Sequence, residues 1–246
     1  IAGIVNFLII LALLLSHFFA AVYANIENPS DYTGTLVLVG AYVLIIYTLD
    51  IIFSYYKQFV IEEKYGFNKA TRKIFILDKI KGLVLIVVLG GSFVYGLTRL
   101  IIKADKFTFF YLWIATVILL FLINILYVKF ILRLFNTITP LEDGELKSEI
   151  TAFAESVGYK VNKISVMNAS KRSTKLNAFF SGFGKFKRIV LFDTLMEKMS
   201  DGEIVSVLAH EIGHAKGKHI IKNALFSIAS NTLLLLILLF CVKSAS

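Results

Sequence analysis

Apolar residues form five long runs along the chain, separated by segments of much higher polarity. Each run has about 20 residues, the length that an α-helix needs to cross the hydrocarbon core of a bilayer. The runs cover residues 4–23, 36–55, 82–102, 109–132 and 224–242. No basic residues precede the first run and no clear small-residue cleavage site follows it, so it is predicted to be a span and not a signal peptide. The pattern predicts an all-α polytopic membrane protein with five spans.

A few polar residues interrupt these runs. They are His17, Asp50, Asn124 and Asn231. Because polar groups are costly in hydrocarbon, they are expected to face the protein interior and to form hydrogen bonds between helices.

Composition supports the membrane assignment. The chain has 246 residues, of which 57% are hydrophobic and 17% are charged, which is too apolar for an ordinary soluble domain. A single cysteine, Cys241, excludes a disulfide framework within the chain. In a membrane protein the net charge of +9 is better interpreted loop by loop than as an affinity for nucleic acid, so the lipid bilayer is expected as a partner and nucleic acid is not.

Lysine and arginine are distributed unevenly between the connecting segments. Residues 24–35 contain none, whereas residues 56–81 contain seven and residues 133–223 contain fourteen. The positive-inside rule therefore predicts that loop 56–81 and segment 133–223 lie on the cytoplasmic side.

Segment 133–223 is the one region expected to fold in water. Apolar residues with helical spacing predict a helix within residues 141–159, and short runs rich in β-branched residues predict strands within 162–168 and 186–193. Residues 177–183 form a third candidate strand, which is either a core strand or an edge strand that pairs with an extended substrate. We therefore expect spans one to four with loop 56–81 in residues 1–132, a small α+β domain in 133–223, and a further span in 224–246.

A metal-binding pattern lies near the end of this domain. The stretch "VLAHEIGHAKGKHI", residues 207–220, contains H-E-x-x-H at His210, Glu211 and His214, shortly after a capping box from Ser200 to Glu203 that predicts a helix start. Histidines four residues apart lie on one helical face and can bind one Zn²⁺, while the adjacent carboxylate can take the proton from the attacking water. The alternative is a surface helix with two incidental histidines, but three of the four histidines of the chain lie within ten residues.

Two histidines leave the zinc short of protein ligands. His219 follows His214 by five residues, and on an unbroken helix it would point about 140° away, so it is not expected to be a ligand. No Asp or Glu follows His214, and a carboxylate from the preceding sequence stays open as the third ligand.

Five ordered blocks of sequence resemble the type I CAAX prenyl endopeptidases, integral-membrane zinc proteases that process prenylated C-termini. The blocks are "FVIEEKYGFNKAT" (59–71), "TPLEDGELK" (139–147), "SKRSTKLNAFFSGF" (170–183), "KRIVLFDTL" (187–195) and "LAHEIGHAKGKHI" (208–220). The resemblance implies that His210 and His214 are zinc ligands and that Glu211 is the general base. It also implies that Asn177, Ala178 and Phe179 lie on an edge strand that aligns the substrate backbone.

The same resemblance implies seven membrane helices around an internal chamber, with a third zinc ligand from a glutamate in an E-x-x-x-D motif one helix further on. The chain is therefore expected to contain five central helices of about seven and to lack both ends. The expected function is that of a membrane-embedded zinc metalloendopeptidase that removes the C-terminal tripeptide from prenylated CAAX proteins, in the endoplasmic reticulum of a eukaryote.

Three alternatives remain open from the sequence. A bacterial source would favour an inner-membrane quality-control protease without prenyl specificity. A chain that lacks the third zinc ligand could be an inactive fragment that only binds or scaffolds. A transporter would also fit five spans, but it gives no reason for a glutamate between two histidines.

Overall fold

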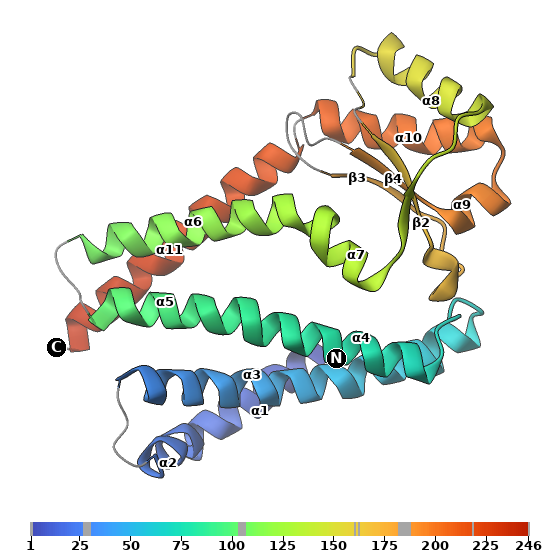
Figure 1. Ribbon diagram of the computed structural model, residues 1–246. Coiled ribbons are helices and arrows are strands. Elements are labelled where there is room, and N and C mark those ends of the chain that lie inside the picture. The colour runs from blue at the N-terminus through green and yellow to red at the C-terminus, as the bar shows by residue number, and fades with distance from the viewer. Residues whose placement is uncertain are drawn as a thin grey trace. The chain divides into compact units, whose positions relative to one another are not determined.

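The computed structural model describes residues 2–26, 31–102, 107–159, 161, 163–181, 188–217 and 219–245. The chain divides into two compact units, residues 1–112 and 113–246, and each is described by itself (Figure 1). The described part of the first unit is helical, and that of the second combines helices with a small sheet.

Helices of the first unit follow the first three apolar runs. They are α1 (Ala2–Leu15), α2 (Phe18–Ala24), α3 (Asp31–Tyr56), η1 (Lys57–Glu62), α4 (Arg72–Leu85), η2 (Ile86–Gly90) and α5 (Gly91–Ile102). Two continuous helices, Tyr32–Glu62 and Arg72–Ile102, are long and apolar enough to cross a membrane. The first expected span, 4–23, is instead a pair of helices bent by 54°, because His17 adopts a left-handed conformation with φ of 56° between α1 and α2.

The basic loop is much shorter than the sequence predicted. Helical structure continues through η1 and resumes at Arg72, so the connection is confined to residues 65–71 and not 56–81. Hydropathy marks where the apolar surface of a helix ends, whereas the backbone helix continues until a turn or cap stops it. Here Gly66 takes a positive φ of 72°, and the hydroxyl of Thr71 caps α4 by accepting a hydrogen bond from the backbone N–H of Ile74 at 3.3 Å.

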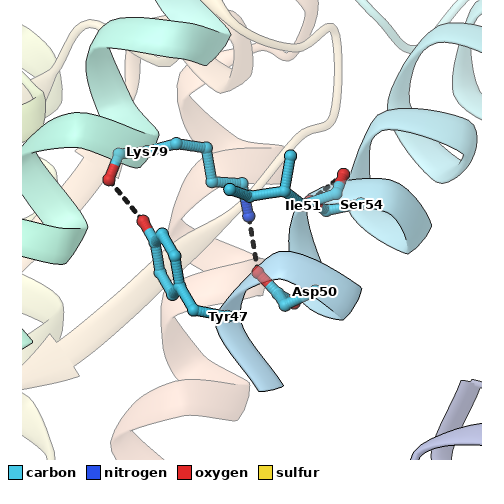
Figure 2. Close-up of polar contacts among 5 residues, drawn as sticks. All are labelled: Tyr47, Asp50, Ile51, Ser54 and Lys79. Atoms are coloured by element: carbon cyan, nitrogen blue, oxygen red, sulfur yellow. Dashed lines mark hydrogen bonds and ion pairs between the residues drawn. The ribbon is translucent and has the colours of Figure 1, made fainter. Parts of the chain in front are cut away.

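An ion pair joins α3 to α4. Figure 2 shows the ammonium of Lys79 donating to the carboxylate of Asp50 at 2.6 Å, while the hydroxyl of Tyr47 donates to the backbone carbonyl of Lys79. The interhelical contact expected for Asp50 is therefore confirmed, and these bonds join α3 to α4.

The second unit contains the sheet and the helices around it. Its elements are α6 (Thr108–Leu126, which crosses the boundary between the units), η3 (Tyr127–Ile131), α7 (Leu132–Phe135), β1 (Ile138–Pro140), α8 (Glu145–Ser156), β2 (Ile164–Met167), η4 (Ala169–Lys171), β3 (Ala178–Ser181), β4 (Arg188–Phe192), α9 (Asp193–Lys198), α10 (Asp201–Lys216) and α11 (His219–Ala245). Within α6 and α11, the apolar helical stretches are Thr108–Ile123 and Ile221–Ile237. Both are shorter than the two helices of the first unit that are long enough to cross a membrane.

This compact unit includes α6 and α11 with the sheet, whereas the sequence placed a domain boundary after residue 132. The indole N–H of Trp113 on α6 donates to the hydroxyl of Thr232 on α11 at 2.7 Å, which ties the two apolar helices to each other.

The sheet is mixed, with strand order β1-β2-β4-β3. The pairs β1–β2 and β3–β4 are antiparallel and the pair β2–β4 is parallel. All three predicted strands are confirmed. Strand β1 was not predicted, because it has only three residues and includes Pro140, which sheets accept at an edge where no N–H is required.

The core lies on both faces of β4, whose central residues are fully buried. Ile189 and Leu191 pack with residues of α8 and α10 on one face, and Val190 packs with the other face, towards Leu132 of α7. Because side chains alternate between the two faces of β4, the face that carries Ile189 and Leu191 is the one that packs against α10, the helix with the H-E-x-x-H motif.

Candidate metal centre and substrate strand

Helix α10 begins as the sequence predicted. The carboxylate of Glu203 accepts hydrogen bonds from the backbone N–H and the hydroxyl of Ser200, each at 2.8 Å. These two bonds, the backbone one first, hold the pKa of Glu203 below its usual range. The negative charge also lies in the first turn, where it complements the helix dipole.

Two opposite faces of α10 have different environments. Ile204, Leu208 and Ile212 recur every four residues and are 1%, 0% and 2% exposed, so this face forms part of the core. His210 follows Leu208 by two residues, about 200° around the helix, and its side chain is exposed. The metal-binding pattern is therefore on the side of α10 that faces away from the sheet, with Glu211 half-buried beside it.

The spacing of the two histidines suits zinc. Residues 210 and 214 lie one turn apart within the single helix α10, and imidazole is a common zinc ligand. The side chain of His214 lies outside the described part of the structure. Among the described side chains, no group of three His, Cys, Asp or Glu residues is arranged to hold a metal ion. The helix therefore offers half of a tetrahedral ligand set.

His219 does not continue the same helix. Helix α10 ends at Lys216, Gly217 follows, and α11 begins at His219. Glycine is a poor helix former, so a break at this point is physically reasonable. The sequence argument against His219 assumed an unbroken helix, and it stays a prediction. The side chain of His219 lies outside the described residues.

Strand β3 contains Ala178 and Phe179, directly follows Asn177, and lies at one edge of the sheet. The N–H of Phe192 donates to the carbonyl of Asn177 at 3.1 Å, and Phe179 is opposite Val190. Since backbone groups alternate in direction along an antiparallel strand, Asn177 and Phe179 direct theirs towards β4. Ala178 and Phe180 direct theirs away from β4, towards the outer edge.

This register changes which residues could bind a substrate backbone. The side-chain carbonyl of Asn177 accepts the N–H of Ala178 at 2.9 Å. Among the residues that the structure describes, the carbonyl of Ala178 and both backbone groups of Phe180 have no strand partner. The sequence pointed to Asn177, Ala178 and Phe179 but missed Phe180. Strand alternation was visible in the sequence, but the register against β4 was not.

The edge strand and α10 share one core. Phe180 packs against the buried cluster of Ala154, Tyr159 and Ile212, and the rings of Tyr159 and Phe180 meet edge to face at 5.5 Å. Burial raises the pKa of Tyr159, so its phenol stays neutral. The core therefore fixes the outer strand relative to the H-E-x-x-H helix.

A carboxylate supports the segment that leads into β3. One oxygen of Asp193 accepts the N–H groups of Ser170 and Thr194 at 2.9 and 2.8 Å, and the other accepts the hydroxyl of Ser170. The hydroxyl of Thr194 in turn donates to the carbonyl of Lys175 at 2.8 Å. These bonds connect both ends of residues 170–175 to the start of α9.

A helical membrane protein with an H-E-x-x-H helix beside the edge strand of a small mixed sheet has the features of an integral-membrane metallopeptidase. Residues 1–137 match the family described as "CAAX prenyl protease N-terminal, five membrane helices", and residues 140–246 match peptidase family M48. The chain belongs to the CAAX prenyl protease family within M48, as its sequence blocks indicated. Membership in M48 implies zinc, and the N-terminal match confirms an integral membrane protein with several helical spans.

Individual relatives agree with this assignment. The chain is 46% identical over 184 residues to CAAX prenyl protease 1 of Saccharomyces cerevisiae, covering 73% of this chain and 40% of the relative. It is 34% identical over 245 residues to the Homo sapiens CAAX prenyl protease 1 homolog, covering 83% and 51%. The crystal structure of S. mikatae Ste24p superposes with a TM-score of 0.81 at 38% identity, covering 91% of this chain and 54% of that one. The chain thus spans about half the length of the relatives it matches.

Proposed function

We propose that this chain supplies the zinc-binding helix and the substrate strand of a membrane-embedded metalloendopeptidase that removes the C-terminal tripeptide of prenylated CAAX proteins. One structural observation carries the proposal. Helix α10 buries Leu208 and Ile212 and exposes His210 on its opposite side, and Ile212 packs in the same core as Phe180 of the outer strand β3. The substrate class rests on the relatives, which are named as CAAX prenyl proteases.

His210 and His214 are the proposed zinc ligands on this chain. The family resemblance implies a glutamate as the third. No Asp or Glu lies between His214 and Ser246, so that ligand is not among residues 215–246. When bound, zinc supplies Lewis acidity that activates water and polarises the scissile carbonyl.

Glu211 moves the protons in the proposed reaction. Its carboxylate takes a proton from the attacking water and delivers it to the amine that leaves. The residue adjoins the first histidine in sequence and is half-buried, so it lies beside the metal position without being needed as a ligand.

Strand β3 aligns the substrate in this proposal. An extended peptide that pairs with its outer edge would use the carbonyl of Ala178 and the N–H and carbonyl of Phe180. Backbone pairing fixes the peptide along the strand without selecting its side chains. The side chain of Phe179 packs edge to face against Phe192 of β4, with ring centres 6.3 Å apart.

The charge distribution supports a cytoplasmic orientation for residues 133–223 and for the connection at 65–71. Together with the family this favours the endoplasmic reticulum membrane, five of about seven spans within this chain, and substrate C-termini that approach from the cytosol.

The test is peptide cleavage by the full-length protein that contains this chain. A farnesylated CAAX peptide and the same peptide with an unmodified cysteine are incubated with the zinc-loaded enzyme, and tripeptide release is followed by mass spectrometry. We expect release from the farnesylated peptide and its loss after chelation. Equal cleavage of both peptides would instead indicate a membrane protease without prenyl specificity, and cleavage of neither would contradict the proposal.

A further inference from the structure

A basic hollow of about 330 Å³ opens over β1 and β2 in the second unit. Its lining comes from α7, β1, α8, the segment before β2, β2 itself and the first residue of β4, and none of it comes from α10 or β3. The hollow is therefore distinct from the zinc helix and from the strand proposed to bind peptide.

Among the described residues, four cationic side chains and no Asp or Glu line this hollow. The cations are Arg133, Lys147, Lys163 and Arg188. Lys147 donates to the carboxylate of Asp143 at 2.6 Å, so one of the four charges has a counter-ion. The side chains of Arg133, Lys163 and Arg188 make no hydrogen bond or ion pair within the part of the chain that the structure describes. Like charges gathered around one concavity repel each other, and a bound anion would relieve that repulsion.

Hydroxyl groups complete the donor set. Thr139 and Ser165 also line the hollow, and Ser165 is buried within β2. Thr151 lines it as well, but its hydroxyl donates to the backbone carbonyl of Lys147 at 2.7 Å and so is not counted as a donor. Guanidinium, ammonium and hydroxyl donors that converge on one space are suited to the several acceptor oxygens of a phosphate group. A solvated charged face would be convex and would mix acidic with basic side chains, whereas this lining is concave and basic.

The position of Arg133 indicates where the phosphate comes from. Arg133 lies in α7, which follows α6 and η3 directly and comes just after the end of the fourth apolar run at residue 132. A residue at this point lies near the level of the lipid headgroups, and basic pockets at that level on the cytoplasmic side favour anionic headgroups. We propose that the hollow binds the phosphate of an anionic lipid headgroup, of the phosphoinositide class, and so docks the sheet domain on the membrane surface.

The test measures binding of a fluorescent phosphatidylinositol 4-phosphate to the full-length protein in neutral detergent by anisotropy. Lys163→Gln and Arg188→Gln are made singly and together. The matched control is Lys171→Gln with Lys198→Gln, which removes two exposed charges of the same unit from outside the hollow. We expect about a tenfold loss of affinity for each charge removed from the hollow, which corresponds to about 1.4 kcal/mol, and an unchanged affinity in the control.

Competition distinguishes the two sources of phosphate. Weak competition by inositol 1,4-bisphosphate and by inorganic phosphate supports a lipid ligand, and competition as strong as that of the lipid supports a soluble phosphate compound in the same hollow. Arg133→Gln provides a further single variant outside the sheet, and thermal unfolding of each variant verifies that it is folded. The proposal is overturned if the parent protein does not bind the lipid, or if folded variants of the hollow bind it as tightly as the control does.

Discussion

Replacing Asp193 tests how the substrate strand is held in place. This carboxylate accepts three hydrogen bonds, two from Ser170 and one from the N–H of Thr194, and it anchors the segment that enters β3. Asp193→Ala removes all three acceptor contacts at once, and Asp193→Asn keeps the shape but replaces one acceptor oxygen with a donor. Neither substitution touches the H-E-x-x-H motif.

The magnitude follows from the burial of these groups. A hydrogen bond to a charged acceptor contributes about 1.5–3 kcal/mol when buried, and these groups are partly exposed, so about 1 kcal/mol each is a reasonable value. The N–H of Thr194 lies in the first turn of α9, where water can replace the carboxylate in part. Asp193→Ala should therefore lower the free energy of unfolding by about 2–3 kcal/mol, and Ser170→Ala by about 1 kcal/mol.

The assay is a double-mutant cycle on the full-length protein, with unfolding followed in parallel with KM for an extended peptide. Ser170→Ala and Asp193→Ala should couple by about 1 kcal/mol, because both remove the bond between the Ser170 hydroxyl and the Asp193 carboxylate. A displaced strand should raise KM more than it lowers kcat. Glu197→Ala, at an exposed position of α9, is the control and should change neither quantity. Additive effects of Ser170 and Asp193, or an unchanged KM in a destabilised Asp193→Ala variant, would refute this role.

Other substitutions test separate parts of the account. His210→Ala and His214→Ala should each lower the zinc content and abolish cleavage, as measured by plasma mass spectrometry beside a peptide assay, and full zinc occupancy in either would show that the ion lies elsewhere. Because the pKa of Glu203 is lowered in the folded state, its contribution to stability is present above the ordinary pKa of a glutamate and is lost as pH falls through the folded value. Glu203→Gln should therefore flatten the acid limb of the unfolding profile, and an unchanged limb would contradict the cap. Cysteines at Ser30 and Lys69 should react with an impermeant reagent from opposite sides of the membrane, and labelling from one side would contradict the predicted topology.

The sequence was most informative where local chemistry determines structure. The cap at Ser200, the apolar spacing of Ile204, Leu208 and Ile212, and the histidine spacing together predicted α10 and its two faces. Strands β2 and β4 were predicted for the same reason, since their β-branched residues suit a pleated, buried surface.

Other features depend on tertiary structure and could not be predicted locally. The register of β3 against β4 decides that Phe180, and not Asn177 or Phe179, has outward backbone groups. The helix through η1 continues past its apolar surface, which shortens the basic connection to residues 65–71.

The role of Glu211 is tested most directly by measuring zinc content and farnesyl-peptide cleavage together in Glu211→Gln of the full-length protein. Glu197→Gln provides a matched neutralisation at an exposed position of α9. If Glu211 moves protons without binding the ion, Glu211→Gln should keep the zinc content of the parent and lower kcat by about 100-fold or more, the range that general acid–base catalysis contributes. Cleavage at the parent rate with zinc bound would remove Glu211 from the mechanism, and loss of zinc would make it a ligand instead of the base.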